Sequence, residues 1–261
     1  MSKMEACETL ILEERPPILK VIFNRPEKLN CLNHQMIQDL IDLTGELRFN
    51  RDIKYVVFTG KGRVFSSGMD LADLTTYADT LVARGSQMLG HDLITKIENL
   101  EQVTFAAING PVIGGALTLA MACDFRIMAD QAKASVPETA RGIFYTWGST
   151  PRLVNLVGPA KAKEIVMLCE DISAEEAYRI GLVSRVVPTD QIFEVIDKMI
   201  ARLEHYGTLA TRLTKKIINS SAAVSFGNIM VFEPELVEHT VLSGEPQEKI
   251  MSFLERRAGS R

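Results

Sequence analysis

The chain has 261 residues, of which 46% are hydrophobic and 24% charged, a composition typical of globular proteins. This length is ample for a buried core, and a formal net charge of -4 gives no electrostatic reason to expect a nucleic-acid partner. No segment has the ~20 consecutive apolar residues of a membrane span, and the first residues have the pattern of neither a signal nor a transit peptide. The four cysteines lie far apart without metal-binding spacing, so we expect reduced thiols, no metal site and a cytoplasmic protein.

Short β-rich runs alternate with helical patterns over the first two-thirds of the chain. Asn33 is expected to cap a helix that runs to about residue 49, where apolar residues recur with helical spacing. The expected strands are 9–12, 18–24, 55–60, 103–108, 125–129 and 182–187. Continuous apolar strands joined by helices predict a parallel sheet that is covered by helices.

The pattern changes to helices near Pro159. The expected helices are 159–168, 173–180, 190–205, 207–221 and 227–241. We therefore expect an α/β body over residues 1–190 and a helical region over residues 191–261. No linker or repeat separates the two, so they are expected to form one structural unit.

Two glycine-bearing corners each join an expected strand to a helix: FTGKGRVFSSGMDLADL at 58–74 and AAINGPVIGGALTLAMACDF at 106–125. Each places backbone N–H groups at a helix start, where the helix dipole favours negative charge. Neither corner has the spacing of a phosphate-binding loop. Because both corners follow strands of one parallel sheet, two amides are expected to converge on one developing oxyanion. The alternative is that the glycines only make tight turns.

The chain resembles the enoyl-CoA hydratase/isomerase (crotonase) family in five segments. These are NRPEKLNCLN (24–33), GKGRVFSSGMDLADL (60–74), AAINGPVIGGALTLAMACDFRIMAD (106–130), SVPETARGI (135–143) and ISAEEAYRIGLVSRVVP (172–188). The resemblance implies an α/β fold, a crotonase-like spiral of ββα/βαβ units with a helical C-terminal trimerisation region. It also implies a homotrimer or dimer of trimers, and an acyl-CoA thioester of fatty acid metabolism as substrate. Coenzyme A would arrive as part of that substrate, with no other cofactor.

Carried over by position, the family's oxyanion hole falls on the backbone N–H groups of Met69 and Gly115, with Gly114 beside them. The side chain of Met69 is expected to shape the acyl pocket. The resemblance implies contacts with coenzyme A at Lys28, Leu29, Ser67, Gly68, Asp70 and Leu71. For Lys28 the alternative is a solvated loop lysine, and for Asp70 it is a capping residue.

Thr118 departs from the family pattern. Hydratases of the family carry two glutamates, and Thr118 stands at the first position whereas Glu138 matches the second. Addition of water needs a base and an acid, and threonine is not a base at neutral pH. One glutamate is enough to shift a double bond, because it can take a proton from C2 and return one to C4. The single glutamate therefore favours an isomerase whose catalytic residue is Glu138. The bulky loop around Phe144, Tyr145 and Trp147, which would line the acyl pocket, also resembles that of the family's isomerases.

Several alternatives stay open. One alternative is a hydratase that recruits another base, and another is an acyl-CoA decarboxylase. A third is a non-catalytic or RNA-binding scaffold with this fold. Glu138 has a second interpretation as a capping or ion-paired carboxylate near Arg141, although an apolar pocket would raise its pKa. Thr118 either holds a water molecule or hydrogen-bonds within its own helix. His91 is expected to begin a helix.

Overall fold

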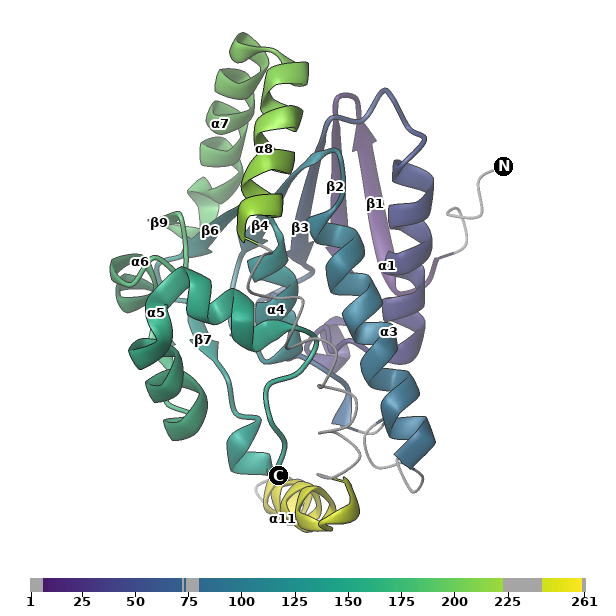
Figure 1. Cartoon of the computed structure of the whole chain (residues 1–261), viewed down its shortest axis with the longest axis vertical. Helices are drawn as coiled ribbons and strands as arrows, with labels where there is room; N and C mark the ends of the chain where they lie inside the picture. The colour runs from purple at the N-terminus through teal and green to yellow at the C-terminus, as the bar shows by residue number, and fades with distance from the viewer. Residues whose placement is uncertain (1–6, 72, 74–79, 223–240, 260–261) are drawn as a thin grey trace.

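The computed structural model describes residues 7–71, 73, 80–222 and 241–259 (Figure 1). Its main sheet has six strands in the order β1-β2-β3-β4-β6-β9, and only the β1–β2 pair is antiparallel. The strands are β1 (Leu10–Arg15), β2 (Ile18–Phe23), β3 (Tyr55–Gly60), β4 (Val103–Ile108), β6 (Phe125–Ala129) and β9 (Arg185–Val187). Every residue of β3 and β4 is buried, because helices cover both faces of the centre of the sheet.

A second sheet is formed by three short strands, which follow β4, β6 and α5 (Ser149–Leu168) in the chain. Its order is β5-β7-β8, with β5 parallel to β7 and β7 antiparallel to β8. The strands are β5 (Val112–Ile113), β7 (Lys133–Ser135) and β8 (Ile172–Ser173). β5 leads directly into Gly114 and the helix of the second glycine corner, so this small sheet fixes the direction in which that corner points.

The helices surround the main sheet. α1 packs beside α3, α4 lies between α3 and α5, and α7 and α8 form a pair that projects beyond the sheet (Figure 1). The α-helices are α1 (His34–Leu47), α3 (Thr80–Glu98), α4 (Gly115–Ala122), α5 (Ser149–Leu168), α6 (Ala174–Arg179), α7 (Ile192–Tyr206), α8 (Thr208–Ala222) and α11 (Glu245–Gly259). The 3-10 helices are η2 (Pro26–Lys28), η3 (Thr139–Arg141) and η4 (Thr189–Gln191).

The structure confirms the expected sheet, which is parallel except for the β1–β2 pair, and a strand lies at each of the six predicted ranges. β1 is longer than predicted, ending at Arg15, and β9 is shorter, beginning at Arg185. The cap of α1 is also confirmed, because the side chain of Asn33 accepts a hydrogen bond from the amide of Met36 at 3.0 Å. Helices α6, α7 and α8 fall within two residues of their predicted ranges. The helix expected at 227–241 lies, except for its last residue, outside the described residues.

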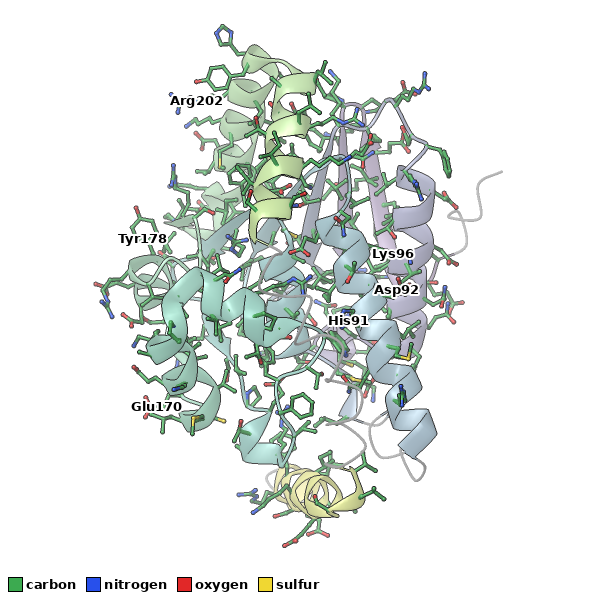
Figure 2. The ribbon with its side chains drawn as sticks, in the orientation of Figure 1. His91, Asp92, Lys96, Glu170, Tyr178 and Arg202 are labelled. Carbon is green, nitrogen blue, oxygen red and sulfur yellow. The ribbon has the colours of Figure 1, made fainter. Side chains whose placement is uncertain are left out.

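Three helical segments differ from the sequence prediction. His91 does not begin a helix; it lies inside α3, together with Asp92 and Lys96 (Figure 2). α5 begins at Ser149 rather than at Pro159, and Gly158, with φ of +78°, kinks it where the prediction began. α11 was not predicted, and it packs beneath η3 (Figure 1). Among the described residues, no helix is long and apolar enough to cross a membrane.

Candidate active site

The two glycine corners lie against each other. Ser66 forms an isolated parallel bridge with Val112, and the amide of Ile113 donates to the carbonyl of Ser66 at 3.1 Å. Gly68 has φ of +82°, and a methyl group added to it would lie 2.6 Å from the carbonyl oxygen of Ile113. The same methyl group would lie 3.5 Å from the amide nitrogen of Gly115. Only glycine therefore lets the chain before Met69 approach the start of α4 this closely.

Gly115 is the first residue of α4, so helix geometry gives its amide no acceptor within the helix. The next seven residues of α4 are all buried, and the helix dipole therefore ends in a low-dielectric environment. Gly114 has φ of +53°, and a methyl group placed on it would overlap Oε1 of Glu138. The amide of Gly115 and the carboxylate of Glu138 are thus neighbours across Gly114.

Glu138 precedes η3 and is held there by backbone hydrogen bonds. Its carbonyl accepts from the amides of Arg141 at 2.9 Å and Ile143 at 3.1 Å. Its side chain makes no capping hydrogen bond, and Oε2 is buried without a hydrogen-bond partner among the described residues. Burial raises the pKa of Glu138 to about 7, and the charge of Arg141 opposes the rise. The capping alternative for Glu138 is therefore wrong, and no described ion pair holds its carboxylate.

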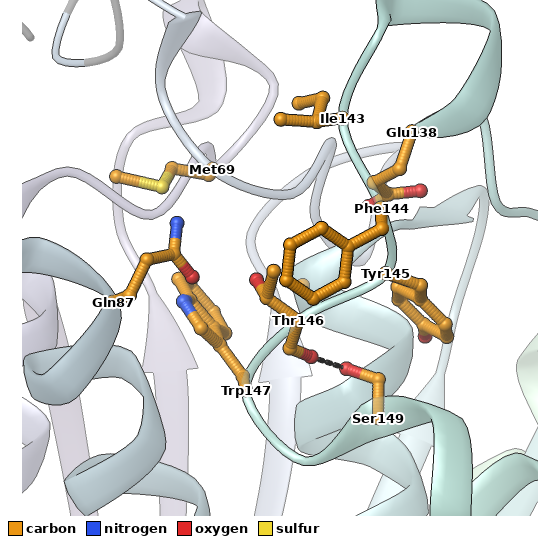
Figure 3. Close-up of a pocket in the computed structure, with 10 residues that line it drawn as sticks. Met69, Gln87, Glu138, Ile143, Phe144, Tyr145, Thr146, Trp147 and Ser149 are labelled. Carbon is orange, nitrogen blue, oxygen red and sulfur yellow. Dashed lines mark hydrogen bonds between the residues drawn. The ribbon is translucent and has the colours of Figure 1, made fainter. Parts of the chain in front are cut away.

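A cavity of about 50 Å³ lies between these groups. Six of the residues expected at the site line it: Met69, Gly115, Glu138, Phe144, Tyr145 and Trp147. The other lining residues are Gln87, Ile143, Thr146 and Ser149 (Figure 3). In Figure 3 Glu138 lies on one side of the cavity, while Gln87 and Trp147 lie on the other. Glu138 is the one acidic residue among the described residues that line it.

Thr118 is fully buried behind the cavity and does not line it. Its Oγ1 is 2.6 Å from Oγ of Ser149 and 3.1 Å from the hydroxyl of Tyr145. It also lies 3.4 Å from the carbonyl of Gly114, four residues earlier in the chain, and the hydroxyl of Tyr145 donates to the same carbonyl at 3.2 Å. Burial raises the pKa of Tyr145, so the phenol is neutral and acts as a donor. Thr118 is thus part of a hydroxyl network that joins α4 to α5.

Trp147 is held tightly at the wall of the cavity. It adopts a left-handed backbone conformation with φ of +63°, and Gly148, with φ of +67°, continues the turn into α5. A methyl group on Gly115 would lie 2.6 Å from the six-membered ring of the indole, and one on Gly90 would overlap its five-membered ring. Glycines of α3 and α4 therefore make the space in which this indole lies.

The residues expected to contact coenzyme A gather near the first corner. The amide of Ser67 donates to the carbonyl of Leu29 at 3.0 Å, which joins the loop of Lys28 and Leu29 to the segment of Gly68 and Leu71. The carboxylate of Asp70 lies 3.2 Å from the guanidinium of Arg25, and the thiol of Cys31 donates to it at 3.1 Å. Asp70 thus has a structural role in holding the two segments together. Lys28 is exposed.

Sequence reasoning missed several lining residues. Ile143 and Thr146 belong to a loop of which only the bulky residues were noted, and Ser149 is the first residue of α5. Gln87 gave no sequence signal, because it lies inside α3, a helix whose first half was not predicted. Its one clue is position: it stands three residues before Gly90 and therefore shares a helix face with it.

Comparison with known proteins agrees with this architecture. The sequence pattern described as enoyl-CoA hydratase/isomerase matches residues 13–260. A crotonyl-CoA hydratase of Syntrophomonas wolfei is 33% identical over 253 residues, 97% of each chain. An enoyl-CoA hydratase structure from Mycobacterium avium subsp. paratuberculosis has a TM-score of 0.85 at 26% identity, over 93% of this chain and 98% of that one. The structure of a monofunctional enoyl-CoA isomerase from M. smegmatis has a TM-score of 0.71 at 32% identity, over 83% and 95%.

The fold and the paired corners therefore define a crotonase-fold protein, with a mixed α/β body and a helical C-terminal part. Within that class, the chain belongs to the enoyl-CoA hydratase/isomerase family of acyl-CoA enzymes.

Proposed function

We propose that this protein shifts the double bond of a 3-enoyl-CoA thioester into conjugation with the thioester carbonyl. The carboxylate of Glu138 takes a proton from C2, and the electron pair moves into the thioester to form a dienolate. The same carboxyl group returns a proton to C4, which leaves the double bond between C2 and C3. The amides of Met69 and Gly115 donate hydrogen bonds to the oxyanion, a contact whose loss typically costs about 3–4 kcal/mol of transition-state stabilisation.

One observation carries this proposal: the described cavity lining holds one carboxyl group, and its pKa is about 7. A group that must first accept and then return a proton works best when its pKa is near the working pH. Hydration would need a second acid–base group. Thr118, at the position where the family's hydratases carry a second glutamate, hydrogen-bonds Tyr145 and Ser149 and does not line the cavity.

The second candidate is hydration of a 2-enoyl-CoA. It is favoured by the names of relatives, since the one from Syntrophomonas wolfei is a crotonyl-CoA hydratase and one from Clostridium acetobutylicum, 30% identical, is a short-chain-enoyl-CoA hydratase. Glu138 would then have to activate a water molecule and also supply the proton for carbon. Decarboxylation of an acyl-CoA would need the oxyanion hole and not Glu138.

The test is incubation of the protein with trans-3-hexenoyl-CoA and with crotonyl-CoA in heavy water. Ultraviolet absorption reports conjugation, and mass spectra report deuterium and added water. We expect conjugation of the 3-enoyl substrate with deuterium at C4, and no hydration of crotonyl-CoA. The Glu138→Gln variant should lose the conversion by about 10²–10⁴-fold. Glu255→Gln, which removes an exposed glutamate of α11, serves as the control.

Rapid hydration of crotonyl-CoA would overturn the proposal in favour of the second candidate. Conversion that survives Glu138→Gln would show that this carboxylate is not the base. Absence of both reactions would refute the isomerase, and loss of CO₂ from a malonyl-type thioester would then identify a decarboxylase.

We also propose a homotrimer or a dimer of trimers. The polar face of α8 is fixed to the body, since Lys215 lies 2.7 Å from the carboxylate of Asp124. Its opposite face presents Leu209, Leu213 and Ile217, which are 52–70% exposed and four residues apart. Such a row is typical of an interface. A monomeric mass in light scattering would contradict it.

A further inference from the structure

Three buried polar atoms without a described partner surround one cavity. The described residues contain five such side-chain atoms, and three of them line the cavity: Oε1 of Gln87, Oε2 of Glu138 and Nε1 of Trp147. Buried polar groups are nearly always hydrogen-bonded, and one left without a partner destabilises the protein. Their gathering in one cavity indicates that a ligand completes their hydrogen bonds. Glu138 already has a function in the proposed proton transfer, which leaves Gln87 and Trp147.

These two atoms have complementary requirements. The indole N–H of Trp147 only donates, and the amide oxygen of Gln87 only accepts. A hydroxyl group satisfies both, because it accepts from the indole and donates to the amide. An ionised carboxylate accepts only, and the described lining has no Lys, Arg or His to balance its charge. A purely apolar acyl group would offer neither atom a hydrogen-bond partner.

The position of the pair places the hydroxyl away from the thioester. The six-membered ring of Trp147 faces Gly115, whose amide belongs to the proposed oxyanion hole, and the five-membered ring with the N–H faces Gly90. Gln87 precedes Gly90 by one turn of α3, and Figure 3 shows its amide beside the indole. The indole N–H and Gln87 therefore lie at the end of the ring that is farther from Gly115.

The donor is also fixed in place. Trp147 is 3% exposed. It packs against Gly90 and Gly115, where a side chain would overlap the indole. A rigid donor favours a ligand group at one position, since little side-chain freedom is lost on binding. These contacts are those of a built binding site rather than of a surface.

We propose that the acyl group of the substrate carries a hydroxyl on its distal part, which accepts from Trp147 and donates to Gln87. This inference rests on the proposed function only in that the substrate is an acyl-CoA. It concerns recognition and does not depend on which reaction Glu138 performs.

Calorimetric binding of saturated acyl-CoA thioesters tests the inference separately from turnover. The probes are hexanoyl-CoA and freshly prepared 4-, 5- and 6-hydroxyhexanoyl-CoA, with adipoyl-CoA as the carboxylate analogue. We expect at least one hydroxylated probe to bind at least about tenfold more tightly than hexanoyl-CoA, since sites built to hydrogen-bond a hydroxyl discriminate strongly against its absence.

Two variants and a matched control locate the effect. Gln87→Leu removes the side-chain amide with its accepting oxygen, Trp147→Phe removes the indole donor, and each should reduce the preference to less than about threefold. Thr95→Val removes a buried hydroxyl of α3 that also lacks a described partner but lies outside the cavity lining, and it should leave the preference unchanged. Gln87→Leu keeps the test valid if Trp147→Phe does not fold.

Equal binding of hexanoyl-CoA and all hydroxylated probes would overturn the inference, since water would then satisfy the two atoms. Binding of none of them would also overturn it. Tightest binding of adipoyl-CoA would identify a carboxylate ligand instead. Failure of isomerisation together with a hydroxyl preference would overturn the proposed function alone, whereas isomerisation without this preference would overturn this inference alone.

Discussion

Replacement of Glu138 by glutamine should make the protein more stable at alkaline pH while it abolishes proton transfer. Burial raises the pKa of this carboxyl group from 4.5 to about 7, so the folded protein binds a proton more tightly than the unfolded chain. Stability therefore falls as pH rises from 4.5 to 7, because the folded state must release a proton that the unfolded state has already lost. The rise of the pKa lowers the free energy of unfolding by about 3 kcal/mol, and the whole of this loss applies above pH 7.

Urea unfolding at fixed protein concentration, followed at pH 5, 6, 7 and 8, measures this effect. The free energy of unfolding of Glu138→Gln should exceed that of the unchanged protein by about 3 kcal/mol at pH 8, and the difference should shrink steadily towards pH 5. Glu255→Gln, on the exposed side of α11, should show no such trend. A difference that is constant with pH, or a less stable glutamine variant at pH 8, would refute the buried, unpaired carboxyl group on which the proton-transfer proposal depends.

Further predictions concern the surroundings of that carboxyl group. The rate (kcat/KM) of the 3-enoyl-CoA conversion should rise with pH and level off above an apparent pKa of about 7, since the proposed base is the ionised form of Glu138; a rate that falls over this range would contradict the assignment. Gly114→Ala should lower kcat about 100-fold, because its methyl group overlaps the carboxylate, and a normal kcat in steady-state assays would refute that contact. Thr118→Glu should lower the free energy of unfolding by about 3 kcal/mol or more without conferring hydration of crotonyl-CoA, since it buries a second charge; a stable and active hydratase would show the opposite. Phe253→Ala removes the ring 4.9 Å from the guanidinium of Arg141 and should speed hydrogen exchange in η3 about fivefold, whereas unchanged exchange would mean that α11 does not hold η3.

The sheet was predictable because its strands are apolar along their whole length. β3 and β4 are buried on both faces, and this requirement appears in the sequence as uninterrupted hydrophobic runs. α1 was predictable for the same kind of reason, since its apolar residues recur with helical spacing and Asn33 marks its start.

The missed helices contain residues that local rules assign to loops. α3 includes Gly85 and Gly90, which weaken a helical prediction, but Gly90 is needed where the indole of Trp147 packs. α5 begins after two left-handed residues and is kinked at Gly158, so its first half has the pattern of a loop. α11 is stabilised by tertiary contacts such as the buried side chain of Ile250 rather than by a strong pattern of its own.

The residues of the site also differ in how far the sequence predicts them. Backbone features such as the close approach of Gly68 to Gly115 leave glycines in the sequence, and these could be predicted as converging corners. Gln87 reaches the cavity only because α3 passes beside Trp147, and no spacing along the chain records that neighbourhood. Residues that act through their backbone were therefore easier to predict than side chains brought in from another element.

Thr118, which stands where the family's hydratases are expected to carry a glutamate, affects the charge near Glu138. Two carboxylates in one site repel each other, so their protons come off at two separated pKa values. Thr118 instead hydrogen-bonds Ser149 and Tyr145 and contributes no charge. The protonation of Glu138 is then set mainly by its burial, which the charge of Arg141 partly opposes, and with a pKa of about 7 both of its forms are populated near neutral pH. The proposed double-bond shift, in which one group takes a proton from C2 and returns one to C4, needs both forms within one catalytic cycle, and a single carboxyl group of this pKa supplies them without a second acid.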